Sequence, residues 1–308
     1  MAQYDFLGVI MRRRNLLALL SLCGFLGCWS LSVYAFWQEA TEGSLDKPEI
    51  ISLLGKKHYA QPAEGEALTQ LKTDLAEAWK AFQSKSGDPE NVILYGRRLA
   101  YLWRYNEAID VYSGGIKNFP DYTMLYRHRG HRYISIRKFD RAVQDLYKAA
   151  GLNSQDFDIW YHLGLAYFLN GNFEEALSAY SSCLSVSEDD ESKVAVSHWL
   201  FMTLRRLERP DDAAKVLNNI IEGMDVEENQ SYYDLLNFYK GRKSVEDIFN
   251  LEEASDLELA TLGFGIGCWY LYNNDEATAK TYFEKIVETK YWPAFGFIAA
   301  EAELFRMK

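Results

Sequence analysis

The stretch Tyr161–Tyr180, YHLGLAYFLNGNFEEALSAY, decides the fold, because its small residues recur along the chain at a fixed interval. Gly164 and Ala176 form a pair within it, and a glycine–alanine pair with the same offset occurs twice earlier in the chain at a constant spacing. Glycine inside a helix costs about 1 kcal/mol relative to alanine, so a periodic glycine indicates a helix crossing where a side chain would clash. The recurring residues are Gly96, Ala108, Gly130, Ala142, Gly164 and Ala176.

Tyr161–Tyr180, with Trp160 before it, resembles a tetratricopeptide repeat. Three units and a fourth with a short insertion are expected at 89–122, 123–156, 157–190 and 194–227, with Ala213 in the alanine place of the fourth. Degenerate repeats, with Ala279 in that place, and a capping helix are expected over 229–308. The resemblance implies an all-α protein over 64–308, a right-handed α-α superhelix in which the first helices form a concave wall.

The N-terminal residues carry a second, independent pattern, a basic cluster followed by an uncharged run. Arg12, Arg13 and Arg14 precede a long run without charge, Asn15–Gln38. Such a run fits a secretory signal, with small residues at Val33 and Ala35 before a cleavage site. It is also long enough to remain in a bilayer, so residues 15–38 are an alternative membrane tether.

Two further points about this terminus stay open. Phe25–Cys28 resembles a bacterial lipoprotein box with poor leading residues, so lipidation at Cys28 is an alternative, and Met11 rather than Met1 suits the start of a signal. We expect residues 1–35 to be a signal peptide or membrane anchor and residues 36–63 to be a linker. The repeat domain is then extracytoplasmic, in the periplasm, secreted or anchored, and the source a bacterium.

Composition narrows the function classes. The 308 residues include 33 Lys and Arg against 44 Asp and Glu, a net charge of -11, which argues against a nucleic-acid binder. Four cysteines cannot form a disulfide scaffold, and we find no nucleophile elbow, metalloprotease helix or carboxylate pair in a pocket context. The sequence therefore predicts neither an enzyme nor a cofactor.

Four local motifs favour structural interpretations. His128 and His131 could share a helix face as zinc ligands, but no carboxylate or cysteine joins them, which favours a solvated or groove-lining face. Gly263–Gly267 lacks the strand and lysine of a phosphate loop and is expected to mark close helix packing. Cys183 and Cys268 are expected to be buried thiols, although export would permit a disulfide. Asn229 begins a glycosylation sequon that applies only to a eukaryotic source.

Charge is unevenly distributed along the repeats. Residues 91–138 hold 9 basic and 3 acidic side chains, whereas residues 139–308 hold 15 and 30. On the expected concave wall a basic end meets an aromatic middle, which suits a peptide with an acidic side chain or C-terminal carboxylate. The alternative is that these arginines are solvated. The predicted groove residues are Arg97, Arg127, His131, Tyr161, Leu165, Phe168, His198, Met202 and Arg205.

Members of the family that bind chaperone tails carry Lys, Asn and Arg at comparable places, where this chain has Arg97, Arg127 and His131. The asparagine is missing, so that particular role is not expected. We expect a non-catalytic protein interaction scaffold that binds a peptide in its groove. Two alternatives are a small anionic or cell-wall-derived ligand and an accessory regulator of a separately encoded envelope enzyme. The oligomeric state is left open.

Overall fold

The computed structural model describes residues 47–60, 64–85 and 87–308. The expected signal or anchor and Cys28 lie outside the described residues. Within them the chain is helical except for one hairpin, in which β1 (Ile50–Ile51) pairs antiparallel with β2 (Lys57–His58). None of the described helices has both the length and the apolar content needed to cross a membrane.

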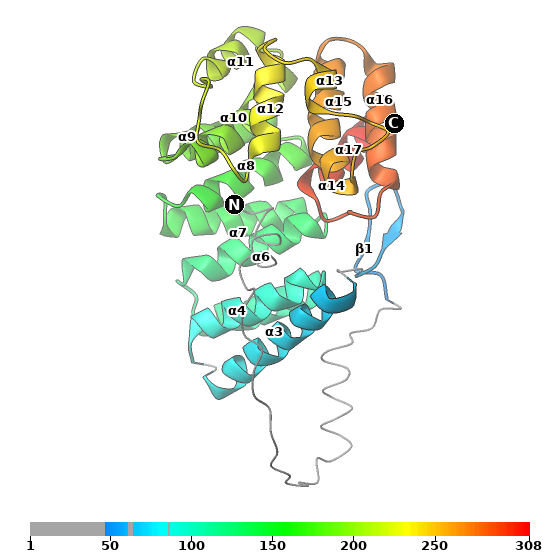
Figure 1. Ribbon diagram of the computed structural model, residues 1–308. Helices are drawn as coiled ribbons and strands as arrows, with labels where there is room; N and C mark the ends of the chain where they lie inside the picture. Colours follow the sequence, from blue (N-terminus) through cyan, green and yellow to red (C-terminus); the bar gives the residue numbers. More distant parts are fainter. Residues whose placement is uncertain (1–46, 61–63, 86) are drawn as a thin grey trace.

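The helices follow one another in stacked pairs, which confirms the predicted all-α solenoid (Figure 1). α3 (Gly65–Ser84) precedes the first pair. The pairs of the four clearest units are α4 (Pro89–Tyr101) with α5 (Tyr105–Asn118), α6 (Thr123–Ser135) with α7 (Phe139–Leu152), α8 (Phe157–Asn170) with α9 (Phe173–Ser185), and α10 (Asp190–Arg206) with α11 (Pro210–Leu217).

Local chemistry explains where these helices begin and end. α4 begins after Asp88, whose carboxylate accepts a hydrogen bond of 3.0 Å from the backbone N–H of Glu90. Pro89 lies in the first turn, where a backbone N–H has no acceptor within the helix, so the missing N–H of proline costs nothing. The first helix of each pair is followed by a residue in the left-handed conformation, which turns the chain back into the second helix. These residues are Trp103, Arg137, Gly171, Glu208 and Asn274.

The periodic glycines lie at helix crossings, as the sequence predicts. A Cβ atom on Gly96 would lie 2.3 Å from the Tyr112 ring, and one on Gly164 would lie 2.6 Å from the Tyr180 ring. In each case the contacted ring belongs to the second helix of the same pair. The alanines that share the period are all fully buried: Ala108, Ala142, Ala176, Ala213 and Ala279.

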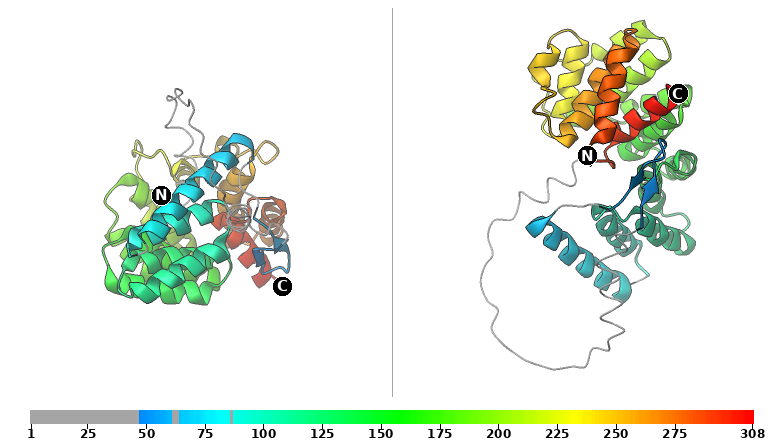
Figure 2. Two further views of the ribbon diagram at one scale, coloured as in Figure 1. Left: turned by 90° about the horizontal axis from the view of Figure 1, so that it is seen from below. Right: turned by 90° about the vertical axis from the view of Figure 1, so that its right-hand side faces the viewer.

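The C-terminal third departs from regular pairs. It consists of α12 (Gln230–Tyr239), α13 (Val245–Ile248), α14 (Asp256–Glu258), a π-helical turn η1 (Leu259–Gly263), α15 (Phe264–Tyr272), α16 (Glu276–Glu288) and α17 (Phe295–Arg306). α17 was expected to cap the end of the solenoid. It instead turns back along the chain, contacts α8 of the third repeat and packs against η1, α15 and α16 (Figure 2).

Buried charge holds α17 in this place. Arg137, in the turn after α6, donates a bond of 2.8 Å to Glu301 of α17, and both side chains are buried. Arg206 at the end of α10 pairs with Glu303 of α17. Arg306 donates to two carbonyl oxygens at the end of α8, those of Phe168 and Leu169, at 3.0 and 2.6 Å. α17 therefore connects the second, third and fourth repeats from one side.

The N-terminal hairpin docks on the same side. The Trp292 indole donates to the Tyr59 carbonyl at 3.0 Å, and Lys56 donates to the Val287 carbonyl at 3.2 Å. At the other edge of the hairpin, Asn106 of α5 donates to the Glu49 backbone at 2.8 Å. The described part of the expected linker is thus a docked hairpin that joins the first repeat to the C-terminal helices.

Candidate functional site

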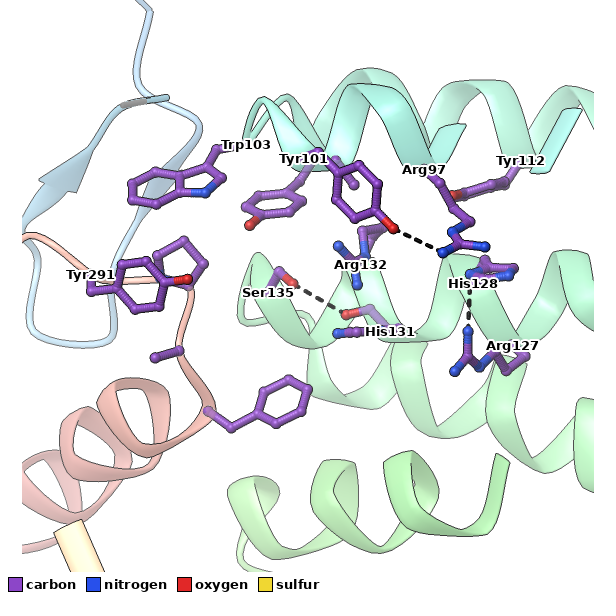
Figure 3. A pocket seen from close by; sticks show the side chains of 15 residues that line it. Arg97, Tyr101, Trp103, Tyr112, Arg127, His128, His131, Arg132, Ser135 and Tyr291 are labelled. Atoms are coloured by element: carbon purple, nitrogen blue, oxygen red, sulfur yellow. Dashed lines mark hydrogen bonds between the residues drawn. The ribbon is translucent and has the colours of Figure 1, made fainter. Parts of the chain in front are cut away.

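A pocket of about 110 Å³ lies between α4, α6 and the segment that leads into α17 (Figure 3). The α4 side supplies Arg97 and Tyr101, which lie four residues apart and so face the same way. The α6 side supplies side chains at spacings of three and four: His128, His131, Arg132 and Ser135, with Arg127 beside them. The segment Tyr291–Phe295 supplies the remaining wall.

Three guanidinium groups line this pocket. Arg97 comes from α4 and donates to the Tyr101 hydroxyl at 2.8 Å. Arg127 pairs with Asp158 of α8 and lies 3.2 Å from Nδ1 of His128. Arg132 extends from α6 toward α4 and lies over the Tyr105 ring, 5.4 Å from its centroid. The first two repeats therefore place all three cations around one cavity.

The histidines of the pocket do not add charge. Burial lowers the pKa of both His128 and His131, and the neighbouring arginines lower it further. His131 lies 4.3 Å, centroid to centroid, from His162 of α8, whose pKa is lowered to about 3 by burial and by Arg127. The imidazoles are therefore neutral at pH 7 and act as polar, uncharged wall groups.

No Asp or Glu is among the described residues that line the pocket. Aromatic side chains from α4, α5 and the segment Tyr291–Phe295 lie among and beside the arginines. They are Tyr101, Trp103, Tyr105, Tyr112, Tyr291 and Phe295. The pocket thus combines cationic and aromatic side chains, which suits an anionic group attached to an apolar body.

The structure brings together three of the nine predicted groove residues, namely Arg97, Arg127 and His131. The predicted aromatic middle is not an open wall. Leu165 and Phe168 are fully buried, and α17 occupies the space in front of α8. Tyr161 is also buried, where its hydroxyl accepts a bond of 2.9 Å from Trp199.

The predicted residues of the fourth repeat are also enclosed or lie elsewhere. His198 is buried and stacks on Tyr232 of α12 at 4.4 Å, and Met202 is fully buried. Arg205 lies over the Trp269 ring, 5.6 Å from its centroid, and donates to the Tyr272 carbonyl at 2.7 Å. It therefore contacts α15 and is not among the residues that line the pocket. The expectation of one continuous exposed groove over four repeats was wrong. Phe168 packs against Phe173 of α9 and Trp199 of α10, whereas His198 packs against α12 and Arg205 against α15.

Sequence reasoning missed two parts of the pocket. Arg132 lies four residues after His128, so the two side chains share one face of α6. This spacing is the sequence signal that marks Arg132 as a pocket residue. The segment Tyr291–Phe295 reaches the pocket only because α17 folds back, and its local sequence carries no sign of this. Neither His128 nor His131 belongs to a metal cluster, since no group of three or more potential ligands is found in the described part of the chain.

The glycine motif of α15 and the two cysteines lie in the packed interior of the fold. Gly265 and Gly267 lie in α15, where an added Cβ would meet Leu235 at 2.6 Å and Phe283 at 2.7 Å, so close packing is confirmed. Cys183 and Cys268 are free and buried, as predicted, and burial raises the pKa of both thiols.

The Asn229 side chain is buried and donates to Glu191 at 2.8 Å. Because its amide nitrogen is already bonded inside the fold, Asn229 is a poor acceptor for a glycan in this conformation.

Parts of the sequence are similar to known proteins. The tetratricopeptide repeat model matches residues 157–190. The chain is 29% identical over 104 residues to small glutamine-rich tetratricopeptide repeat-containing protein 2 of Saccharomyces cerevisiae, which covers 34% of this chain and 30% of that protein. It is 27% identical over 116 residues to the BBSome complex member BBS4 of Bos taurus, which covers 37% of this chain and 22% of that protein. The chain thus spans less than a third of the length of either relative.

Two solved structures have a similar helical arrangement. MamA is 14% identical with a TM-score of 0.44, and the match covers 68% of this chain and 94% of that one. YrrB, described as a TPR protein with an unusual peptide-binding site, is 15% identical with a TM-score of 0.44, covering 68% and 91%. The match over residues 157–190 shows one tetratricopeptide repeat in the chain, and the two helix pairs before it carry a glycine at the same place of the first helix.

Proposed function

We propose that the chain is a non-catalytic interaction scaffold whose basic pocket holds an acidic group of a partner peptide. The observation that carries this proposal is the convergence of Arg97, Arg127 and Arg132 on one cavity that has no carboxylate among its described lining residues. Guanidinium groups recognise carboxylates and other oxyanions with paired hydrogen bonds, and such contacts are stronger where water is partly excluded. Tetratricopeptide repeat proteins are in general protein-binding scaffolds, which agrees with this role.

The filled groove limits where a partner can lie. Because α17 covers α8, an extended peptide cannot run along the first helices of the third and fourth repeats without displacing it. The pocket formed by α4 and α6 is an accessible part of the concave side. We therefore expect a short recognition element, an acidic side chain or a terminal carboxylate with an apolar neighbour, rather than a long groove-bound helix.

A peptide display experiment tests this role. Peptides selected on the wild-type protein from libraries with free and with blocked C-termini should be enriched in Asp, Glu or a free carboxylate. Arg97→Gln should weaken the selected peptides about tenfold, because a hydrogen bond to a charged group contributes about 1.5–3 kcal/mol.

Arg98 provides the matched control. It is the next residue on α4, pairs with Asp74 of α3 at 3.1 Å and is not among the residues that line the pocket. Arg98→Gln should leave peptide affinity unchanged. Selected peptides without acidic groups, or equal affinity for the wild type and Arg97→Gln, would refute the proposed role of the pocket.

We also propose that the domain works outside the cytoplasm, exported or tethered by its N-terminal segment. The support is the sequence Arg12–Arg14 followed by the uncharged run Asn15–Gln38. Intact-mass measurement of the protein from its native source distinguishes cleavage after Ala35, lipidation of Cys28 and retention of the whole segment. A chain that begins at Met1 and fractionates with the cytosol would exclude export.

A further inference from the structure

One segment of the chain crosses the fold and packs on three buried histidines. This C-terminal strap, residues 291–306, comprises the segment that leads into α17 and α17 itself. At the N-terminal hairpin, the His58 ring stacks on Trp292 with the ring centroids 5.6 Å apart, and it stands nearly perpendicular to the Phe297 ring at 5.5 Å. His58 is buried, and its Nε2 has no hydrogen-bond partner in the described structure. The strap therefore covers an imidazole that has little access to water.

The other two histidines come from α6 and α8 and lie against the start of α17. The Phe295 ring is 5.3 Å from the His131 ring and 5.8 Å from the His162 ring, measured between centroids. The two imidazoles are themselves 4.3 Å apart. Both are buried, and Nε2 of His162 has no hydrogen-bond partner among the described residues. Three of the five histidines of the chain therefore lie buried where the strap docks.

A proton on His58 would add to positive charge that is already present. Lys56 faces this ring from the hairpin, and Arg137 faces it from the turn after α6. Glu301 of α17 also faces it, but this carboxylate is bonded to Arg137 at 2.8 Å. Burial, and after it Arg137, lowers the pKa of His58 to about 4. His58 is therefore neutral at pH 7 while the strap covers it.

The two histidines of α6 and α8 have neighbours of the same kind. Burial lowers the pKa of both, and Arg127 and Arg132 lower it further, to about 3 for His162. The carboxylate of Asp158 is also near His162, but it is paired with Arg127. Besides each other, the charged and titratable groups that face these two imidazoles are Arg127, His128 and Arg132 of α6 and Asp158 and Tyr161 of α8. While the strap is docked, a proton on either imidazole would be a further buried cation beside two arginines.

We infer that the docking of the C-terminal strap is acid-sensitive: proton uptake by His58, His131 and His162 releases the strap from the hairpin, α6 and α8, while the helix pairs remain folded. A histidine that release exposes has its ordinary pKa of about 6.5, so the docked strap has its full stability above that pH and loses it progressively as the pH falls below it. The segment Tyr291–Phe295 also lines the pocket, so release removes one of its walls. This inference goes beyond the proposed function, because it concerns the strap and holds whether or not the pocket binds an acidic group.

Amide hydrogen exchange of the whole protein at pH 7.5 and 5.5, corrected for the intrinsic rate, tests the inference. Each histidine that release exposes should raise the population of the released state about tenfold over this range, so exchange in α17 should become at least about tenfold faster. Amides of α5, which lies inside the repeats, should stay better protected than those of α17 at both pH values, because they exchange only when the fold opens globally. Unchanged exchange in α17, or equal protection of α17 and α5 at pH 5.5, would overturn the inference.

Two variants identify the histidines responsible. His58→Phe keeps a ring against Trp292 and loses no hydrogen bond at Nε2, and it should remove up to about tenfold from the acid-induced rise of exchange in α17. His131→Phe should have the same effect, and it carries the test if His58→Phe does not fold. A rise in α17 that is as large in both variants as in the wild type would contradict the assignment.

His198→Phe is the matched control. His198 is also buried, but its ring contacts are with Trp199 of α10 and with Tyr232 and Tyr239 of α12. The substitution should reduce the acid-induced rise of exchange in α5, which depends on global unfolding, and leave the rise in α17 unchanged. If it lowers the rise in α17 as much as His58→Phe does, global unfolding is responsible and the inference fails. No ligand enters these experiments, so their outcome leaves the proposed function untouched.

Discussion

Single small residues set the distance between paired helices. Gly164 faces the Tyr180 ring, three atoms of which lie 2.6–2.8 Å from where a Cβ would stand, and Tyr180 is fully buried. Gly164→Ala should therefore lower the free energy of unfolding by about 1–3 kcal/mol, through overpacking. Urea unfolding measures the change.

Gly114 is the control for this substitution. It lies inside α5 with no atom within 4 Å of where an added Cβ would stand, so Gly114→Ala should stabilise by about 0.5–1 kcal/mol through helix propensity. A similar effect of the two substitutions would show that helix propensity, rather than the crossing, decides the cost at Gly164.

A second residue-level prediction concerns the turns. Glu208 is exposed and has a φ of 56°, in the left-handed region, which costs a residue with a side chain about 1–2 kcal/mol. Glu208→Gly should remove that strain and raise the free energy of unfolding by up to about 1 kcal/mol, after the added entropy of the unfolded glycine. Glu284→Gly, at an exposed position inside α16, should instead destabilise by about 1 kcal/mol. Thermal unfolding of both variants checks the opposite signs.

At this scale the sequence predicts the structural residues well and the site only in part. Gly96 and Gly164 are predictable because the ring that constrains each of them lies in the same helix pair. Arg97 and Arg127 are predictable because they fall on the expected first-helix face. The segment Tyr291–Phe295 is not, since it reaches the pocket from another part of the chain.

The docking of α17 depends on buried ion pairs. Arg137 and Glu301 are 164 residues apart, both are almost fully buried, and Arg137 also donates to the Trp292 carbonyl at 3.0 Å. Glu301→Ala leaves the Arg137 cation without its partner, so we expect a loss of about 3–5 kcal/mol. Urea unfolding gives the total, and faster amide exchange in α17 would show that this element detaches first.

The exposed pair Lys280–Glu284 provides the comparison, with its atoms 3.9 Å apart at the surface of α16. Glu284→Gln should change stability by less than about 0.5 kcal/mol. A loss below about 1 kcal/mol for Glu301→Ala would mean that the Arg137–Glu301 pair does not hold α17 in place.

Helix pairs can be predicted from sequence here, but the path of α17 cannot. Pairs arise from contacts between neighbouring helices, which leave a period of about 34 residues in the chain. The return of α17 depends on contacts with α8 and with the turn after α6, and these have no repeat to reveal them. The predicted groove residue Phe168 is buried for a separate reason, because its ring packs against Phe173 of α9 and Trp199 of α10.

On the scale of the whole molecule, the charge asymmetry of the sequence has a spatial counterpart. The basic segment 91–138 contains the helices α4 and α6, and three of its arginines meet at one pocket. Other arginines of the segment, such as Arg129 and Arg137, are bonded to acidic residues elsewhere in the fold. The excess charge is thus concentrated at one end of the concave side rather than spread along it.

Another property of the whole molecule is that all five histidines are buried: His58, His128, His131, His162 and His198. Burial lowers the pKa of each one, to about 4 for His58 and about 3 for His162 and His198. The unfolded chain takes up these protons as the pH falls through about 6.5, whereas the folded chain resists them to a much lower pH. The contribution of the histidines to stability is therefore fully present above that pH and is lost progressively as the pH falls below it.

His198 isolates one member of this set. It stacks on Tyr232 and Tyr239, and neither of its ring nitrogens has a hydrogen-bond partner in the described structure. His198→Phe keeps the stacking and removes one titrating group, so the slope of unfolding free energy against pH should decrease by about one proton, or about 1.4 kcal/mol per pH unit, below pH 6. Urea unfolding of both proteins between pH 7.5 and 5 measures the slopes. Equal slopes would mean that His198 reaches solvent and protonates in the folded state, because only a histidine kept neutral by burial makes the folded chain resist the proton that the unfolded chain accepts.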